Sequence, residues 1–301
     1  MTPETVAATG FLAEPFMRSA LLAGTASALA AGFVGYFLVL RTQVFSSDAL
    51  GHVAYTGALG ALAFGFDPRA GLIIATVATA CAMAGLGMRG RPDDVAIGST
   101  FAWILGLGSF FLTLYTTRHS SGNSTANVTY LFGSIFGISS SHAKLVAVIA
   151  IAACVVMALI ARPLLFASLD EAVAAARGVP VRLLGVGFLA LVGVVCAESA
   201  QTVGALLLLG LIAAPAGAAR RLTSRPFMAM ALSAGIGVGC MWAGLLFSFY
   251  LPVLRPSFAI MSAATLAYVG AVALAASRNR SRAPKTSRLT PTRDIGEPIH
   301  R

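Results

Sequence analysis

The stretch FSSDALGHVAYTGALG, residues 45–60, places an acid and an imidazole inside an otherwise uncharged run. Asp48 and His52 are four residues apart, so on a helix they lie on one face, about one turn from each other. Ionisable side chains inside a membrane are costly and are usually kept for a function. We therefore expect this stretch to be a helix of a membrane protein, with Asp48 and His52 as its functional pair.

The composition of the whole chain also indicates an integral membrane protein. Of its 301 residues, 57% are hydrophobic and only 11% are charged, and the mean hydropathy is +0.85. A soluble domain carries about 25% charged residues. The net charge of +10 comes mainly from arginines in short loops and in the C-terminal tail, which is the distribution of cytoplasmic membrane loops. We expect contacts with membrane lipid and none with nucleic acid.

Nine apolar segments predict an all-α, polytopic membrane bundle of eight or nine transmembrane helices, some of them short and interrupted. One segment is short enough that eight crossings plus a half-helix is the alternative. The arginine-bearing loops place the N-terminus outside and the C-terminus in the cytoplasm. We expect a transmembrane domain over residues 1–276 and a basic, disordered cytoplasmic tail over 277–301. The segments are residues 18–40, 48–66, 71–88, 95–117, 143–160, 183–197, 203–214, 228–249 and 258–276.

Three catalytic or nucleotide-binding motifs are missing from the sequence. It has no GxxxxGK[ST] loop for ATP phosphates, no HExxH and no GxSxG. We therefore expect a transport subunit of the cell membrane that is not an enzyme and holds no permanent cofactor.

Asp48 and His52 offer an oxygen and a nitrogen ligand, a mixture that suits zinc, manganese or ferrous iron. Two ligands cannot close a coordination shell, but a symmetric dimer would supply four. Two other interpretations stay open at this point. Asp48 could cap a helix start while His52 bonds a neighbouring carbonyl group, or the pair could relay protons.

The remaining polar and cysteine residues give weaker signals. His119 and His142 flank the longest polar loop, and Glu198 falls between two apolar segments. The two histidines could form a low-affinity entry point for the metal ion, but we interpret all three residues as solvated. Each of the four cysteines stands alone in an apolar segment, without a second ligand at metal-motif spacing, and is expected to be a small core residue.

Five stretches resemble the permease subunits of ABC-type zinc, manganese and iron uptake systems, the ABC-3 family. They occur in the family's order, and the resemblance covers about residues 15–276. The chain departs from the family pattern at Gly51, where serine is usual, and at Ser134, where many members carry an acid. The matching stretches are FLVLRTQVFSSDALGH (37–52), DDVAIGSTFA (93–102), YLFGSIF (130–136), LDEAVAAARGVPVRLL (169–184) and QTVGALLLLGLIAAPAGAARRL (201–222).

The resemblance implies a homodimer that surrounds one path for a divalent metal ion. An extracytoplasmic binding protein would deliver Zn²⁺, Mn²⁺ or Fe²⁺, and cytoplasmic ATP-binding subunits would drive its import. Asp48 and His52 match the family's residues along the metal path. An ion-coupled secondary metal transporter without an ATPase, and a membrane scaffold or enzyme, are the alternatives. The implied ATPase coupling segment contains Pro215, Ala219, Arg220, Arg221, Leu222 and Arg225.

Overall fold

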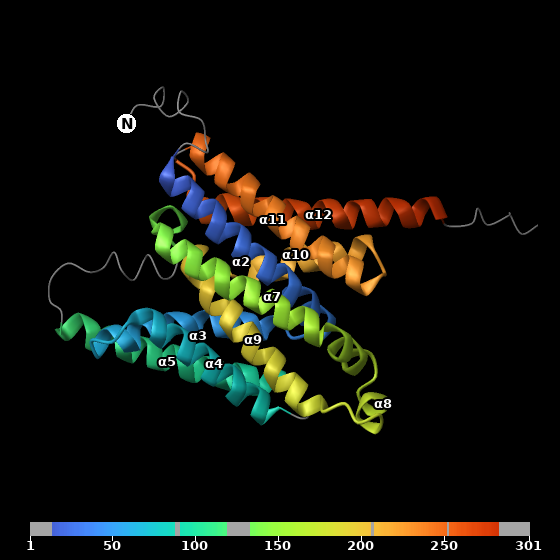
Figure 1. Cartoon of the computed structure of the whole chain (residues 1–301), viewed down its shortest axis with the longest axis horizontal. Helices are drawn as coiled ribbons and strands as arrows, with labels where there is room; N and C mark the ends of the chain where they lie inside the picture. The colour runs from blue at the N-terminus through green and yellow to red at the C-terminus, as the bar shows by residue number, and fades with distance from the viewer. Residues whose placement is uncertain (1–13, 88–90, 119–132, 206–207, 252, 283–301) are drawn as a thin grey trace, which may run out of the picture.

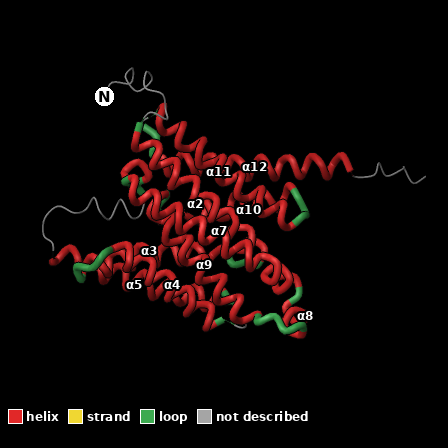
Figure 2. The backbone as a smooth tube through the Cα atoms, in the orientation of Figure 1, coloured by secondary structure: helices red, strands yellow, loops and turns green. Residues whose placement is uncertain are grey.

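The computed structural model describes residues 14–87, 91–118, 133–205, 208–251 and 253–282. These residues are helical, with short turns and no strand among them (Figure 2). The all-α prediction is therefore confirmed. The helices are α2 (Pro15–Leu40), α3 (Val44–Ala63), α4 (Pro68–Leu86), α5 (Asp94–Arg118), η1 (Ile135–Gly137), α7 (Ser140–Leu169), α8 (Glu171–Ala176), α9 (Val181–Thr202), α10 (Leu208–Leu222), α11 (Pro226–Tyr250) and α12 (Pro256–Arg282).

Seven helices in the described ranges are long and apolar enough to cross a membrane: α2, α4, α5, α7, α9, α11 and α12. The chain is thus a multi-pass membrane protein. The predicted count of eight or nine is not confirmed. α3 and α10 do not belong to this set of seven: α3 carries Asp48 and His52, and α10 has only 15 residues.

The helices form two groups on either side of a central layer (Figure 1). α2, α7 and α9 make up the layer, and the buried rings of Phe37 and Phe188 join α2 to α9 across it. α3, α4 and α5 pack together on one side, where α4 contacts α9. α10, α11 and α12 pack on the other, where α11 contacts α2.

Small residues allow α2 and α11 to approach closely. A Cβ atom on Gly32 would collide with the backbone of Ala234, and one on Gly24 would lie 3.0 Å from the Met241 side chain. The Ser233 hydroxyl donates a hydrogen bond to the Gly32 carbonyl at 2.8 Å. Without a hydrophobic driving force in lipid, such close packing and hydrogen bonds hold helices together.

Several helices continue beyond the apolar segments predicted for them, and α7 runs to Leu169, nine residues past its predicted end at 160. α9 runs through Glu198 to Thr202, because the polar residues of its last turns are buried against other helices. α10 continues through the buried Pro215 to Leu222, since a proline inside a membrane helix is tolerated where neighbours compensate. α12 extends to Arg282, six residues past the expected domain boundary; residues 283–301 lie outside the described residues.

Arginine side chains link the helix ends at one end of the molecule. Arg41 bonds the Ser168 hydroxyl at 3.4 Å, Arg91 bonds the Ala167 carbonyl at 3.2 Å, and Arg220 bonds the Val39 carbonyl at 2.9 Å. We call this the arginine-rich end; it carries α8 and the α10–α11 turn (Figure 1). This common location agrees with the orientation predicted from charge.

Candidate metal site

A turn of three residues, 41–43, connects α2 to α3, the helix that carries Asp48 and His52. The amide of Gln43 donates to the Leu38 carbonyl at 2.9 Å, which closes the turn. Thr42 has φ +57° and is the one non-glycine residue with positive φ in the described ranges. Such a conformation is uncommon outside glycine and tends to occur at functional positions.

Asp48 lies one turn into α3 and is half-buried. It lines a cavity of about 400 Å³ between α3 and α5. A second carboxylate, from Asp94 at the start of α5, lines the same cavity. The other lining residues are Phe45, Ala49, Ile97, Gly98 and Phe101.

His52 is half-buried one turn further along the same helix. Its ring packs edge-on against Phe101 of α5, with ring centroids 5.1 Å apart and an interplanar angle of 63°. Phe101 also lines the cavity with Asp48, so the same ring of α5 contacts His52 and borders the space beside Asp48.

Cys196 of α9 contacts α3 at the residue before Asp48. Its thiol donates to the Ser47 carbonyl, with the sulfur 3.7 Å from the oxygen. The side chain is fully buried, as the sequence predicts for a core cysteine. Ser47, the residue next to Asp48 in the first turn of α3, therefore packs beside α9.

The described part of one chain does not hold a complete metal shell. No group of three or more histidine, cysteine, aspartate or glutamate side chains is placed to hold a metal ion there. Asp48 and His52 have the donor atoms for a transition-metal dication but too few of them for a closed shell. A site shared by two copies of the chain stays a prediction.

Asp94 was missed by sequence reasoning, although it lies in one of the quoted stretches. Two adjacent acids at a helix start are well explained by capping, and the Asp93 side chain does accept a hydrogen bond from the Ala96 amide at 2.9 Å. Capping by Asp93 assigns no role to Asp94. The packing of α5 against α3 brings Asp94 to the cavity of Asp48.

The predicted coupling segment lies on α10 and in the turn after it, at the arginine-rich end. Arg220 lines a cavity of about 310 Å³ with Tyr36 and Thr223. Two groups with different exposure make up the segment. Pro215 and Ala219 are buried, Leu222 is half-buried, and Arg220, Arg221 and Arg225 are exposed.

Two expectations for polar residues at the opposite end were wrong. Glu198 is 3% exposed and His142 is 7% exposed, so neither is solvated. Both lie within helices that pack against each other, Glu198 in α9 and His142 in the first turn of α7. His119 lies outside the described residues.

Several manganese and iron transport proteins are similar in sequence to this chain. A manganese transport system membrane protein, MntC of Halalkalibacterium halodurans, is 28% identical over 85% of this chain and 86% of its own length. The manganese import system permease protein ScaB of Streptococcus parasanguinis is 25% identical, covering 83% and 87%. The chelated iron transport system membrane protein YfeC of Yersinia pestis is 29% identical over 73% of both chains.

A solved structure has the same fold. A chain of PsaBC from Streptococcus pneumoniae in complex with Fab superposes with a TM-score of 0.76 at 23% identity, covering 90% of this chain and 95% of that one. The model of the ABC 3 transport family matches residues 13–275. This match spans nearly all of the described residues and almost the same range as the resemblance noted in the sequence. The chain therefore belongs to the ABC 3 transport family.

Proposed function

We propose that this chain is the membrane permease subunit of an ATP-driven importer of a divalent transition metal. Manganese is the first candidate, because relatives over most of the chain are named for manganese transport. Iron is a second, from the relative named for chelated iron. Zinc is the third, since Asp48 and His52 suit it equally well.

The observation that carries this proposal is the cavity between α3 and α5. Asp48 and Asp94 both line this cavity, and Phe101, which also lines it, packs against the ring of His52. Carboxylates lower the free energy of a dication in a low-dielectric region, while an imidazole favours transition metals over calcium and magnesium. Two copies of the chain would double this donor set and surround one path between them.

A conducting site must bind its ion weakly enough to release it. A site that divides its ligands between two copies of the chain, with a cavity beside each pair, is expected to meet that condition. We expect the ion to reach Asp48 and His52 from an extracytoplasmic binding protein. ATP-binding subunits at the arginine-rich end would then switch access to the cytoplasm, with the C-terminal tail on that side.

Metal uptake by cells tests the site. Asp48→Ala and His52→Ala should each abolish manganese uptake at normal expression, whereas Glu14→Gln, a carboxylate variant remote from the cavity, should not. Normal uptake by either site variant would remove the site assignment.

Transport by purified components tests the dependence on ATP. Vesicles that contain the chain with its ATP-binding subunits should accumulate ⁵⁴Mn²⁺ only with ATP. Accumulation by the chain alone under a proton or sodium gradient would instead identify an ion-coupled secondary transporter.

A further inference from the structure

Glu198 is a buried carboxylate without a hydrogen-bond partner in the described structure. It is 3% exposed, in the second-last turn of α9, and neither of its oxygens accepts a hydrogen bond from a described residue. An unpaired carboxylate in a low-dielectric region costs several kcal/mol as an anion. Such a group is stabilised by a cation that binds to it.

His142 provides a second unsatisfied ligand from another helix. Its Nδ1 atom is buried and forms no hydrogen bond with the described residues, and its ring interacts with the Gln201 side chain. A hydrogen bond from Nε2 to Gln201 would leave Nδ1 as the atom that can bind a metal ion. Metal-ligating histidines almost always have their second ring nitrogen fixed in this way, which orients the ring and sets its tautomer.

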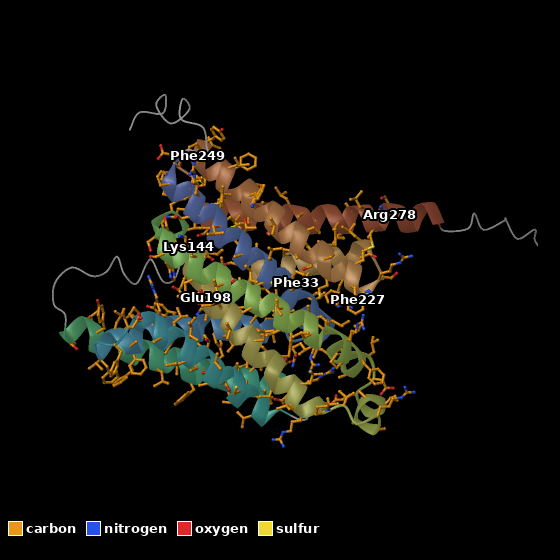
Figure 3. The ribbon with its side chains drawn as sticks, in the orientation of Figure 1. Phe33, Lys144, Glu198, Phe227, Phe249 and Arg278 are labelled. Atoms are coloured by element: carbon orange, nitrogen blue, oxygen red, sulfur yellow. The ribbon has the colours of Figure 1, made fainter. Side chains whose placement is uncertain are left out.

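The geometry of α9 brings these groups together. Gln201 follows Glu198 by three residues, so the two share one helix face, and α7, which carries His142, packs against α9, where His142 interacts with Gln201. Arg69, in the first turn of α4, interacts electrostatically with both Glu198 and His142. The site therefore lies where three helix ends meet, and Figure 3 shows Glu198 at the same end of the bundle as Lys144.

We propose that Glu198 and His142, with Gln201 as the positioning residue, form a second site for the transported divalent metal ion. The inference rests on the proposed function, since it takes the same cargo. A carboxylate oxygen and an imidazole nitrogen are the donor types already present in Asp48 and His52.

The second site lies closer to the extracytoplasmic end than Asp48 does. Cys196 contacts the Ser47 carbonyl, and Glu198 is two residues further along α9, about 3 Å along the helix axis. His52 is five residues beyond Ser47 on α3, so by the same rise per residue Glu198 lies between the levels of Asp48 and His52.

The charges around the site favour weak binding. Arg69 and Lys144 are exposed cations on α4 and α7, and Asp67 is an exposed acid at the α4 cap. Both carboxylate oxygens of Glu198 are without a hydrogen-bond partner in the described structure, so Arg69 does not hydrogen-bond to Glu198. A nearby arginine repels a dication, so the ion is held only briefly, as a transit site requires.

Metal binding to the full-length purified chain in lipid nanodiscs tests the proposal. MnCl₂ alone is the probe, bound ions are counted by equilibrium dialysis and mass spectrometry, and electron paramagnetic resonance reports the ligands. The variants are Glu198→Gln, His142→Ala, the double variant D48A/H52A, and the triple variant D48A/H52A/E198Q. Glu14→Gln serves as the matched control, and size-exclusion profiles check that each variant is folded.

We expect Glu198→Gln and His142→Ala each to lose one ion per chain relative to the wild type and the control. The double variant should keep that ion, and the triple variant should bind none. Wild-type stoichiometry and affinity in Glu198→Gln would overturn the second site, and would mark Glu198 as a protonated structural acid. Complete loss of binding in the double variant would overturn it as well.

The two proposals fail in distinguishable ways. If the double variant binds as many ions as the wild type while Glu198→Gln loses one, the result supports the second site and rejects Asp48 and His52 as a metal site. The positioning role of Gln201 has its own readout. Gln201→Leu should weaken Mn²⁺ affinity by about 10- to 100-fold without changing the number of ions at saturation, and unchanged affinity would remove that role.

Discussion

The guanidinium of Arg41 donates a hydrogen bond from Nη1 to the Ser168 hydroxyl across 3.4 Å, joining the turn before α3 to the end of α7. Its Nε donates to Gln43 Oε1 at 3.1 Å, and its Cζ lies 5.6 Å from the centre of the Phe188 ring. Burial and the nearby charge of Arg91 lower the pKa of Arg41 to about 10, against an opposing effect of Glu171. The group is still charged at neutral pH, and it fixes the starting point of the helix that carries Asp48.

Removing this arginine should destabilise the fold. Arg41→Ala leaves the Gln43 and Ser168 groups without a charged partner, which should lower the free energy of unfolding by about 1.5–3 kcal/mol. Arg41→Lys should recover only part of the loss, because an ammonium group cannot reproduce the fork of a guanidinium. Unfolding in mixed micelles measures the effect, with the exposed Arg182→Ala as control. Equal stability of the wild type and Arg41→Ala would show that the turn is held by other contacts.

The close contact between α2 and α11 predicts a second stability effect. Gly32→Ala adds a methyl group against the Ala234 backbone and should cost about 1–3 kcal/mol. Gly235→Ala on α11 is the matched control, since a Cβ atom there meets no atom within 4 Å. The melting temperature in detergent should fall for the first variant only. A fall of the same size in the control would mean that helix packing at Gly32 is not responsible.

The ring of Phe101 should affect metal binding through His52. Aromatic pairs contribute about 0.5–1.5 kcal/mol beyond buried area, so Phe101→Leu should loosen His52 and weaken Mn²⁺ binding by up to about tenfold. Isothermal titration of the purified chain carrying Glu198→Gln isolates this site from the second one. Unchanged affinity in Phe101→Leu would indicate that His52 is positioned by α3 alone.

Arg220 and Arg221 should behave differently although they are neighbours. Arg220 donates a hydrogen bond to the Val39 carbonyl at 2.9 Å, so Arg220→Glu should lower the melting temperature as well as ATPase binding. Arg221 is exposed, and no hydrogen bond holds its side chain in the described structure. Arg221→Glu should weaken co-purification of the ATP-binding subunits at unchanged melting temperature. An intact complex would mean that the coupling contact lies elsewhere on the cytoplasmic side.

Apolar runs predicted the position of every long helix, because membrane helices are specified mainly by local hydropathy. The errors came from polar residues and prolines whose surroundings are set by other parts of the chain. Glu198 was taken for a turn residue because its sequence neighbours are polar, whereas packing buries it within α9. The apolar segment before Pro215 was predicted to end at residue 214, but α10 continues through Pro215.

The candidate site was only partly predictable. The spacing of Asp48 and His52 placed them on one helix face, since four residues make about one turn. Asp94 and Phe101 come from a different helix, and no spacing rule relates α5 to α3. The unpartnered atoms of Glu198 and His142 also appear only after α7 and α9 have been packed.

ATP-driven uptake of ⁵⁴Mn²⁺ into vesicles is the most direct test of the central claim, that metal passes Asp48 and His52 under the control of ATP-binding subunits. The assay compares the wild-type complex with Asp48→Asn, which keeps the size of the side chain and removes its charge. We expect the variant to assemble with its ATP-binding subunits and to hydrolyse ATP, while its metal uptake falls to the level seen without ATP. Wild-type uptake by Asp48→Asn would contradict the account.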